Sequence, residues 1–214
     1  MRDEETGSWW QQVTGEAIQG PLKGRKLTQV HNDELTFAAW KREQPGGRVL
    51  RPDERVAAEY EPADWEERYT KLRVITPVDP ADKIPQRTLI AGITISKDSK
   101  AFPIADLQKQ KLILDQVGGT PIFLVIGADN KSVRAFERTV DGRKLEFFVK
   151  PESVIVELVD AETGSTWDFT GKATSGPLAG RQLKPVYVLK DYWFDWKIYH
   201  PETRFYELGE RLKN

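Results

Sequence analysis

The chain has 214 residues, a formal net charge of −1, 39% hydrophobic residues and 30% charged residues. This length allows one or two domains with a real core, and the near-neutral charge favours neither nucleic acid nor an anionic membrane as a partner. The chain contains no cysteine, which excludes disulfides, thiolate metal ligands and cysteine nucleophiles. The longest apolar run, residues 121–128, is too short to span a membrane, and the acidic N-terminus does not resemble a signal peptide.

One phrase of the sequence occurs twice. "DEETGSWWQQVTGEAIQGPLKGRKL" begins at Asp3, and "DAETGSTWDFTGKATSGPLAGRQL" begins at Asp160. With a single one-residue gap the register continues past Trp40 and Trp196, and roughly twenty of about forty-seven positions are identical, which indicates a duplicated unit. The acids, threonines and glycines of the phrase are typical of turns, so we expect most repeated residues to maintain the fold.

The first copy occupies residues 1–50. Trp10 follows the turn on a predicted strand, a Gly-Pro loop leads to a second strand ending at Val30, and "NDELTFAAWKREQP" predicts a helix capped near Asn32 or Asp33. A long β-like stretch precedes the second copy, but only Met1 and Arg2 precede the first. We therefore expect residues 1–50 to be the C-terminal half of a sister domain, either cut from a longer chain or docked on another surface.

A charged, proline-rich connection is predicted over residues 51–85, with a short helix at residues 63–71. The complete unit follows over residues 86–207. It begins with a hairpin around "KDSK", continues with two strands around Gly118-Gly119, and contains a hairpin around Asp141-Gly142 that suits a type I′ turn. A strand "SVIVELV" leads into the second phrase. About eight strands with one or two short helices predict a β-rich α+β domain, an antiparallel barrel or sandwich, with a partial second copy.

The chemistry-bearing residues are few. His31 and His200 do not align with each other in the repeat, so we predict no metal site, no cofactor site and no catalytic residue. Aromatic density is the remaining signal: packing against the sheet is the plain interpretation, and a surface for a sugar, a peptide or a partner subunit is the alternative. The candidate residues for a partner or ligand surface are Trp9, Trp10, Trp40, Trp193, Trp196 and His200.

The repeated phrase, with its Trp-bearing helix, resembles the prokaryotic family known as domain of unknown function 3179. The second unit is similar to that domain over nearly its whole length, including "AGITISKDSKAFPIADL", "LDQVGGTPIFLVI" and "FERTVDGRKLEF". The first fifty residues resemble only its C-terminal half, and Met1 and Asp3 match a Met-x-Asp of the family, which implies an internal methionine. Many members look exported, which implies an exported or cell-envelope parent protein.

Departures from the family bear on function. The resemblance implies two cysteines in a Cys-Pro-Leu-Cys-like stretch where this chain has Gly127 and Asn130, although Ser132 still matches. It also implies a Trp-His-Glu where this chain has Lys109, Gln110 and Lys111. If the family uses a thiol or metal centre, this unit has lost its ligands.

Two functional classes follow from these observations. The residues favour a non-catalytic binding or scaffold module over an enzyme. The alternative is a fragment of a metal-binding or redox enzyme whose active centre lies upstream of residue 1. Because a few strands with one apolar face are not stable alone in water, we expect residues 1–50 to join a sister domain or, as the favoured form, a second copy in a homodimer.

Overall fold

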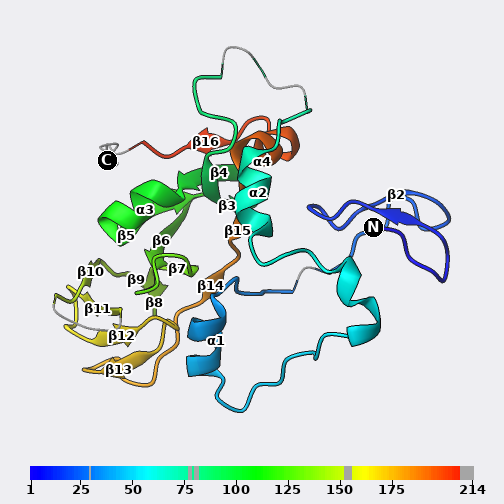
Figure 1. Ribbon diagram of the computed structural model, residues 1–214. Helices are drawn as coiled ribbons and strands as arrows, with labels where there is room; N and C mark the ends of the chain where they lie inside the picture. Colours follow the sequence, from blue (N-terminus) through cyan, green and yellow to red (C-terminus); the bar gives the residue numbers. More distant parts are fainter. Residues whose placement is uncertain (29, 77–78, 80–81, 152–155, 208–214) are drawn as a thin grey trace. The chain divides into compact units, whose positions relative to one another are not determined.

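The computed structural model describes residues 1–28, 30–76, 79, 82–151 and 156–207 (Figure 1). The chain forms two compact units, Met1–Asn32 and Asp33–Asn214. The predicted division at residues 50 and 85 stays a prediction.

The first unit contains a two-stranded antiparallel sheet made of β1 (Trp9–Trp10) and β2 (Ala17–Gln19). Its turn is held by Asp3, which accepts hydrogen bonds from the Thr6 backbone N–H at 2.6 Å and from Trp10 Nε1 at 2.8 Å. In the second unit Asp160 accepts the corresponding bonds from Thr163 at 2.7 Å and Trp167 at 2.9 Å. The two phrases therefore have the same local structure.

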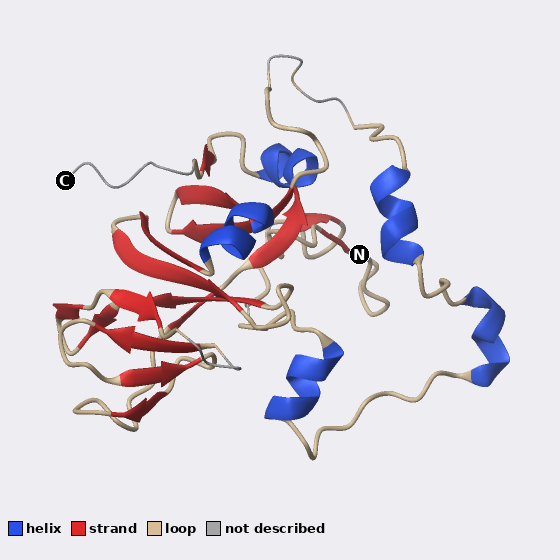
Figure 2. Ribbon diagram, turned by 60° about the vertical axis from the view of Figure 1, so that its left-hand side comes forward, coloured by secondary structure: helices blue, strands red, loops and turns tan. Residues whose placement is uncertain are grey.

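Three four-stranded sheets build the second unit (Figure 2). The outer sheet has the order β15 (Leu189–Tyr192), β3 (Leu89–Ile95), β4 (Asp98–Pro103), β16 (Arg204–Phe205). The middle sheet has the order β14 (Pro185–Val186), β7 (Val133–Glu137), β6 (Thr120–Ile126), β5 (Leu112–Val117). The third sheet has the order β10 (Phe147–Val149), β11 (Glu157–Asp160), β12 (Thr166–Asp168), β13 (Ala173–Ser175). A small hairpin, β8 (Thr139–Val140) and β9 (Arg143–Lys144), precedes β10.

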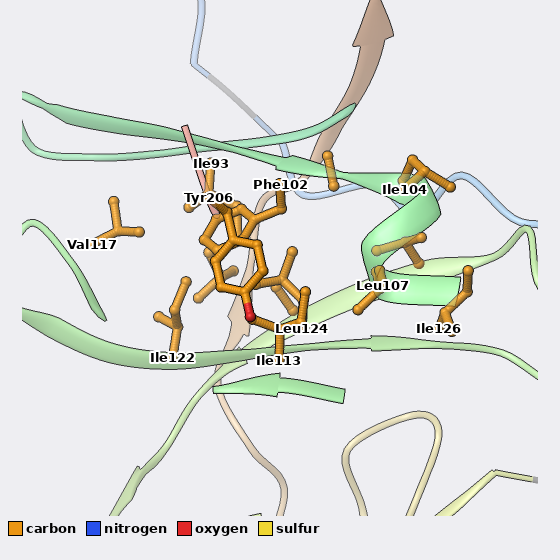
Figure 3. Packing of buried hydrophobic residues seen from close by; sticks show 14 residues of the cluster. Ile93, Phe102, Ile104, Leu107, Ile113, Val117, Ile122, Leu124, Ile126 and Tyr206 are labelled. Atoms are coloured by element: carbon orange, nitrogen blue, oxygen red, sulfur yellow. The ribbon is translucent and has the colours of Figure 1, made fainter. Parts of the chain in front are cut away.

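The middle sheet is buried on both faces. Along β6, Ile122 and Leu124 point into a core shared with Ile93 and Phe102 of the outer sheet (Figure 3). Phe123 points the other way, into a second core that includes residues of the third sheet. This alternation is the period of two that a strand imposes on its side chains. The unit is thus a layered, sandwich-like α+β fold, and none of the sheets formed by the described residues closes into a barrel.

The described residues also form short helices. They are α1 (Phe37–Glu43), the 3₁₀ helix η1 (Glu54–Glu59), α2 (Trp65–Lys71), α3 (Ile104–Gln110) and α4 (Trp193–Tyr199). α4 covers the outer sheet, where Trp193 and Trp196 pack with Ile90 and Ala101. α3 closes one end of the sandwich through Ile104 and Leu107. None of the helices within the described residues is long and apolar enough to span a membrane.

Most predicted turns are confirmed. Gly118 and Gly119 both have positive φ between β5 and β6, and Asp141 and Gly142 both have positive φ, as a type I′ turn requires. The predicted helix at residues 63–71 is α2. The strand predicted for "SVIVELV" is present as β11 from Glu157, while its beginning at residues 153–155 lies outside the described residues.

Three details differ from prediction. The first hairpin turns at Ser96, which has φ of 60°, and β4 already begins at Asp98, because Asp98 pairs with Ile95 directly across this turn. β16 runs parallel to β4, so the outer sheet is mixed. The N-cap of α1 is Thr36. The reason for the last difference is that Asp33 forms an ion pair with Arg134.

Candidate functional site

The loop of residues 127–132 lies at one end of the middle sheet, between β6 and β7. The Gly127 N–H donates to the Ser132 carbonyl at 2.8 Å, and Asn130 takes a positive φ of 56° at its tip. Lys111, which follows α3, donates from Nζ to Asn130 Oδ1 at 2.5 Å. The loop is therefore held both by its own backbone and by the end of α3.

Asp129 organises this loop. Its Oδ1 accepts from the backbone N–H groups of Lys131 at 2.9 Å and Ser132 at 2.8 Å, and its Oδ2 accepts from Ser132 Oγ at 2.5 Å. The Thr36 hydroxyl donates to the same Oδ2 at 2.7 Å. Partial burial alone would raise the pKa of Asp129, but these hydrogen bonds to the ionised form hold the pKa well below its ordinary value.

Helix α1 begins on this loop. The backbone N–H of Thr36 donates to Ser132 Oγ at 3.0 Å, while the Thr36 side chain accepts from the Ala39 N–H at 3.2 Å as an N-cap. Ser132 Oγ thus accepts from Thr36 and donates to Asp129. Ala39 is buried and lies beside Gly127 and Ala128, so its small side chain allows close approach of the helix to this loop.

Arg134 on β7 anchors the same segment. Its Nη1 and Nη2 donate to the two carboxylate oxygens of Glu43, both at 2.8 Å, and its Nε and Nη2 donate to Asp33 Oδ2 at 3.0 and 2.7 Å. The guanidinium lies 4.8 Å from the ring centroid of Phe169 and is only 8% exposed. Burial opposes the charge, but the two carboxylates raise the pKa of Arg134 above its ordinary value.

A cavity of about 150 Å³ lies between α1 and the ends of the middle and third sheets. Its lining residues are Ala39, Arg42, Glu43, Gly127, Ala128, Asp129, Ser132, Val156, Asp168, Phe169 and Thr170. The Ser132 hydroxyl donates to Asp129, but this carboxylate also accepts from Thr36 and its pKa is lowered, which makes it a weak base. The arrangement is suited to holding a polypeptide segment by charge and hydrogen bonds.

The predicted aromatic residues do not gather on one surface. Trp193 and Trp196 are buried on α4, and Trp196 Nε1 donates to Thr203 Oγ1 at 2.9 Å. His200 stacks on Trp196 with ring centroids 3.8 Å apart, and its Nδ1 lies 3.2 Å from Ser99 Oγ. Burial lowers the pKa of His200, so the imidazole is neutral at neutral pH. These contacts are those of a helix packed on a sheet.

The other three candidates lie elsewhere. Trp9 and Trp10 are in the first unit. Trp9 is 48% exposed, whereas the Trp10 side chain donates a hydrogen bond to Asp3. This difference is expected for neighbours on a strand, because their side chains point to opposite faces. Trp40 is on α1 and stacks on Phe37 with ring centroids 5.6 Å apart. A role of these residues in partner binding stays a prediction.

The sequence reasoning missed the polar residues that hold α1, namely Asp33, Thr36, Glu43, Asp129 and Arg134. One signal could have found three of them. In the predicted repeat, Leu189, Tyr192 and Tyr199 align with Asp33, Thr36 and Glu43. A polar residue that aligns with an apolar or aromatic one predicts contact with a different surface.

Among the residues that the structure describes, no group of three or more His, Cys, Asp or Glu side chains could hold a metal ion. A family model described as "Protein of unknown function (DUF3179)" matches residues 1–203. Neither the comparison with curated proteins nor that with solved structures gave a match.

Proposed function

This chain belongs to the family described as "Protein of unknown function (DUF3179)", and we propose that it is a non-catalytic binding or scaffold module. The observation that carries the proposal is the way residues 33–43 lie on β7 and the loop of residues 127–132. We call this surface, formed by Asp129, Ser132 and Arg134, the docking site.

The docking site has the properties of a specific binding surface. A bidentate arginine–carboxylate pair fixes both the position and the orientation of the bound helix. A buried ion pair adds little net stability compared with an apolar contact, so its presence supports a role in selecting one partner segment. The Thr36 hydrogen bonds add a second anchor at the other end of the helix.

We further propose that residues 1–50 and 86–207 are two copies of one unit, the first incomplete, joined by the connection of residues 51–85. The twenty or so shared positions and the equivalent hydrogen bonds of Asp3 and Asp160 support this division. In this arrangement the docking site ties the helix of the incomplete copy to the complete one.

A partner that binds through residues 1–50, either a second copy of the chain or a sister domain, is part of the proposal. Support comes from the large apolar side chains that the first unit leaves exposed to solvent. The redox or metalloenzyme alternative is less favoured, since Gly127 and Asn130 stand where the resemblance implies cysteines.

A peptide of residues 32–45 tests the docking site. We expect the labelled peptide to bind to a full-length chain that carries Asp33→Asn and Glu43→Gln. These substitutions weaken the contacts of the chain's own residues 33–43 with the docking site, and fluorescence anisotropy measures the binding of the peptide. The peptide should bind the unaltered chain much more weakly, because the covalently linked segment competes at high effective concentration. A peptide carrying Glu43→Gln is the matched control.

Equal binding of the two peptides, or no binding to the altered chain, would contradict the scaffold proposal. Stoichiometric uptake of zinc, copper or iron by the full-length chain, measured by elemental analysis, would favour the enzyme alternative instead.

A further inference from the structure

The two copies of the repeat differ in what covers them. Leu27 is 52% exposed, whereas its counterpart Leu183 is 1% exposed, and Val30 is 77% exposed, whereas its counterpart Val186 is 7% exposed. The side chains are identical in each pair. The difference therefore lies in the neighbours and not in the residues.

The structure identifies the neighbours that bury the second copy. Val186 pairs with Ala135 of β7 in the middle sheet. Leu183 packs in one core with Phe136 and Phe147. All three neighbours lie within residues 86–150, the segment that precedes the phrase, so this segment supplies an edge strand and an aromatic sheet face.

The first copy has the same local geometry without that cover. β1 pairs with β2 in the register Trp9↔Gln19 and Trp10↔Ala17, with an irregularity between them. The strands β12 and β13 show the same two-residue register and the same irregularity. The bridge between Glu16 and Lys26 also has its counterpart in the second copy, between Lys172 and Gln182. The backbone that presents Leu27 is therefore already formed.

We infer that the surface formed by Leu27 and Val30, here called the open face, binds a polypeptide segment that is an unpaired counterpart of residues 86–150. Such a segment offers an edge strand like β7 to the backbone around Val30 and an aromatic sheet face to Leu27. The inference rests on the proposed function and names the chemistry of the segment that binds there.

A second copy of this chain is a poorer occupant. In the described residues, β7 is paired on one edge with β6 and on the other with β14, so the chain's own middle sheet offers no free strand there. The matching half-unit has to come from a polypeptide in which this edge is not already filled.

A chimera tests the open face directly. A second copy of residues 86–157 is fused to the N-terminus of the full chain, since Met1 aligns with Leu158 in the repeat. Leu27→Cys is introduced into both the natural chain and the chimera. Because the chain contains no cysteine, the rate of reaction with Ellman's reagent reports on this one position.

We expect the thiol at position 27 to react rapidly in the natural chain and about tenfold or more slowly in the chimera, because the added half covers it. Ile18→Cys is the control: Ile18 is 53% exposed, and its counterpart Thr174 is also exposed, so the reaction rate there should be the same in both chains.

Equal rates at position 27 in the two chains would overturn the inference, whether the added half misfolds or folds elsewhere. The inference would also be overturned if the natural chain is a dimer by light scattering and its thiol at position 27 reacts slowly. That result would identify a second copy of the chain as the occupant. Neither outcome depends on the docking site, whose failure would appear only in the peptide-binding experiment.

Discussion

Glu43 and Arg134 form a two-point ion pair, with Oε1–Nη1 and Oε2–Nη2 distances of 2.8 Å, across 91 residues of sequence. The pair joins the last turn of α1 to the strand β7. A seven-residue helix has little stability of its own, so contacts of this kind determine whether α1 is helical.

Glu43→Gln is expected to lower the free energy of unfolding by about 1–3 kcal/mol, because Arg134 stays buried with half of its charge compensation removed. Urea denaturation measures the effect. Lys41→Gln, on the exposed side of the same helix, is the control and should change stability by less than about 0.5 kcal/mol. Equal losses for the two variants would mean that the ion pair does not anchor α1.

The depressed pKa of Asp129 predicts acid sensitivity. A carboxyl with a folded-state pKa below its unfolded value stabilises the fold at neutral pH, and this contribution is lost as pH falls below about 4. Asp129→Asn should therefore be less stable than the natural chain at pH 7, and the difference should shrink toward pH 2. Thermal unfolding at a series of pH values gives the comparison, and a difference independent of pH would contradict it.

The raised pKa of Asp191 predicts that stability depends on pH in the opposite direction. Burial and the nearby Asp195 raise its pKa to about 6, so the folded chain binds this proton more tightly than the unfolded chain. The stability contribution is therefore present below about pH 4 and is lost as pH rises through about 6.

Asp191→Asn should accordingly raise the free energy of unfolding at pH 7.5 by about 1–2 kcal/mol, less than full linkage because the carboxyl is partly solvated. At pH 4 the variant and the natural chain should be nearly equal. Chemical denaturation at the two pH values measures both, and a variant that is less stable at pH 7.5 would refute this account of Asp191.

Gly92 is expected to tolerate no side chain. A Cβ at this position would lie 2.4 Å from the Trp196 ring, so Gly92→Ala must displace α4 from the outer sheet. We expect a loss of about 1–3 kcal/mol in the free energy of unfolding. Gly46→Ala is the control, since a Cβ there meets no atom within 4 Å. Differential scanning calorimetry should show a lower melting temperature for the first variant only.

Local features of the fold were predictable from the sequence. Gly118-Gly119 and Asp141-Gly142 specify their turns because few residues adopt positive φ, and the acid and threonine of the repeated phrase bond their own backbone. The N-cap of α1 was not predictable in the same way. Asn32 and Asp33 both fit the local N-cap pattern, but the Asp33 carboxylate accepts a hydrogen bond from Arg134, about one hundred residues away, and Thr36 is the N-cap.

The docking site and the segment that it holds could not be predicted from sequence patterns. The docking site lies on β7 and the loop of residues 127–132, and no local spacing relates Asp129 to Thr36 or Arg134 to Glu43. The aromatic residues were the more visible signal, but Trp193 and Trp196 are buried by the outer sheet. Burial of a helix face depends on topology, and sequence spacing alone does not determine it.

Hydrogen–deuterium exchange of the full chain tests most directly whether β7 and the loop of residues 127–132 hold α1. The account predicts that the backbone amides of Ala39 to Gln44 are protected in the natural chain and lose most of that protection in Arg134→Met, while β5 and β6 stay protected in both. Exchange of these amides in the natural chain as fast as in the connection of residues 51–76 would contradict the account.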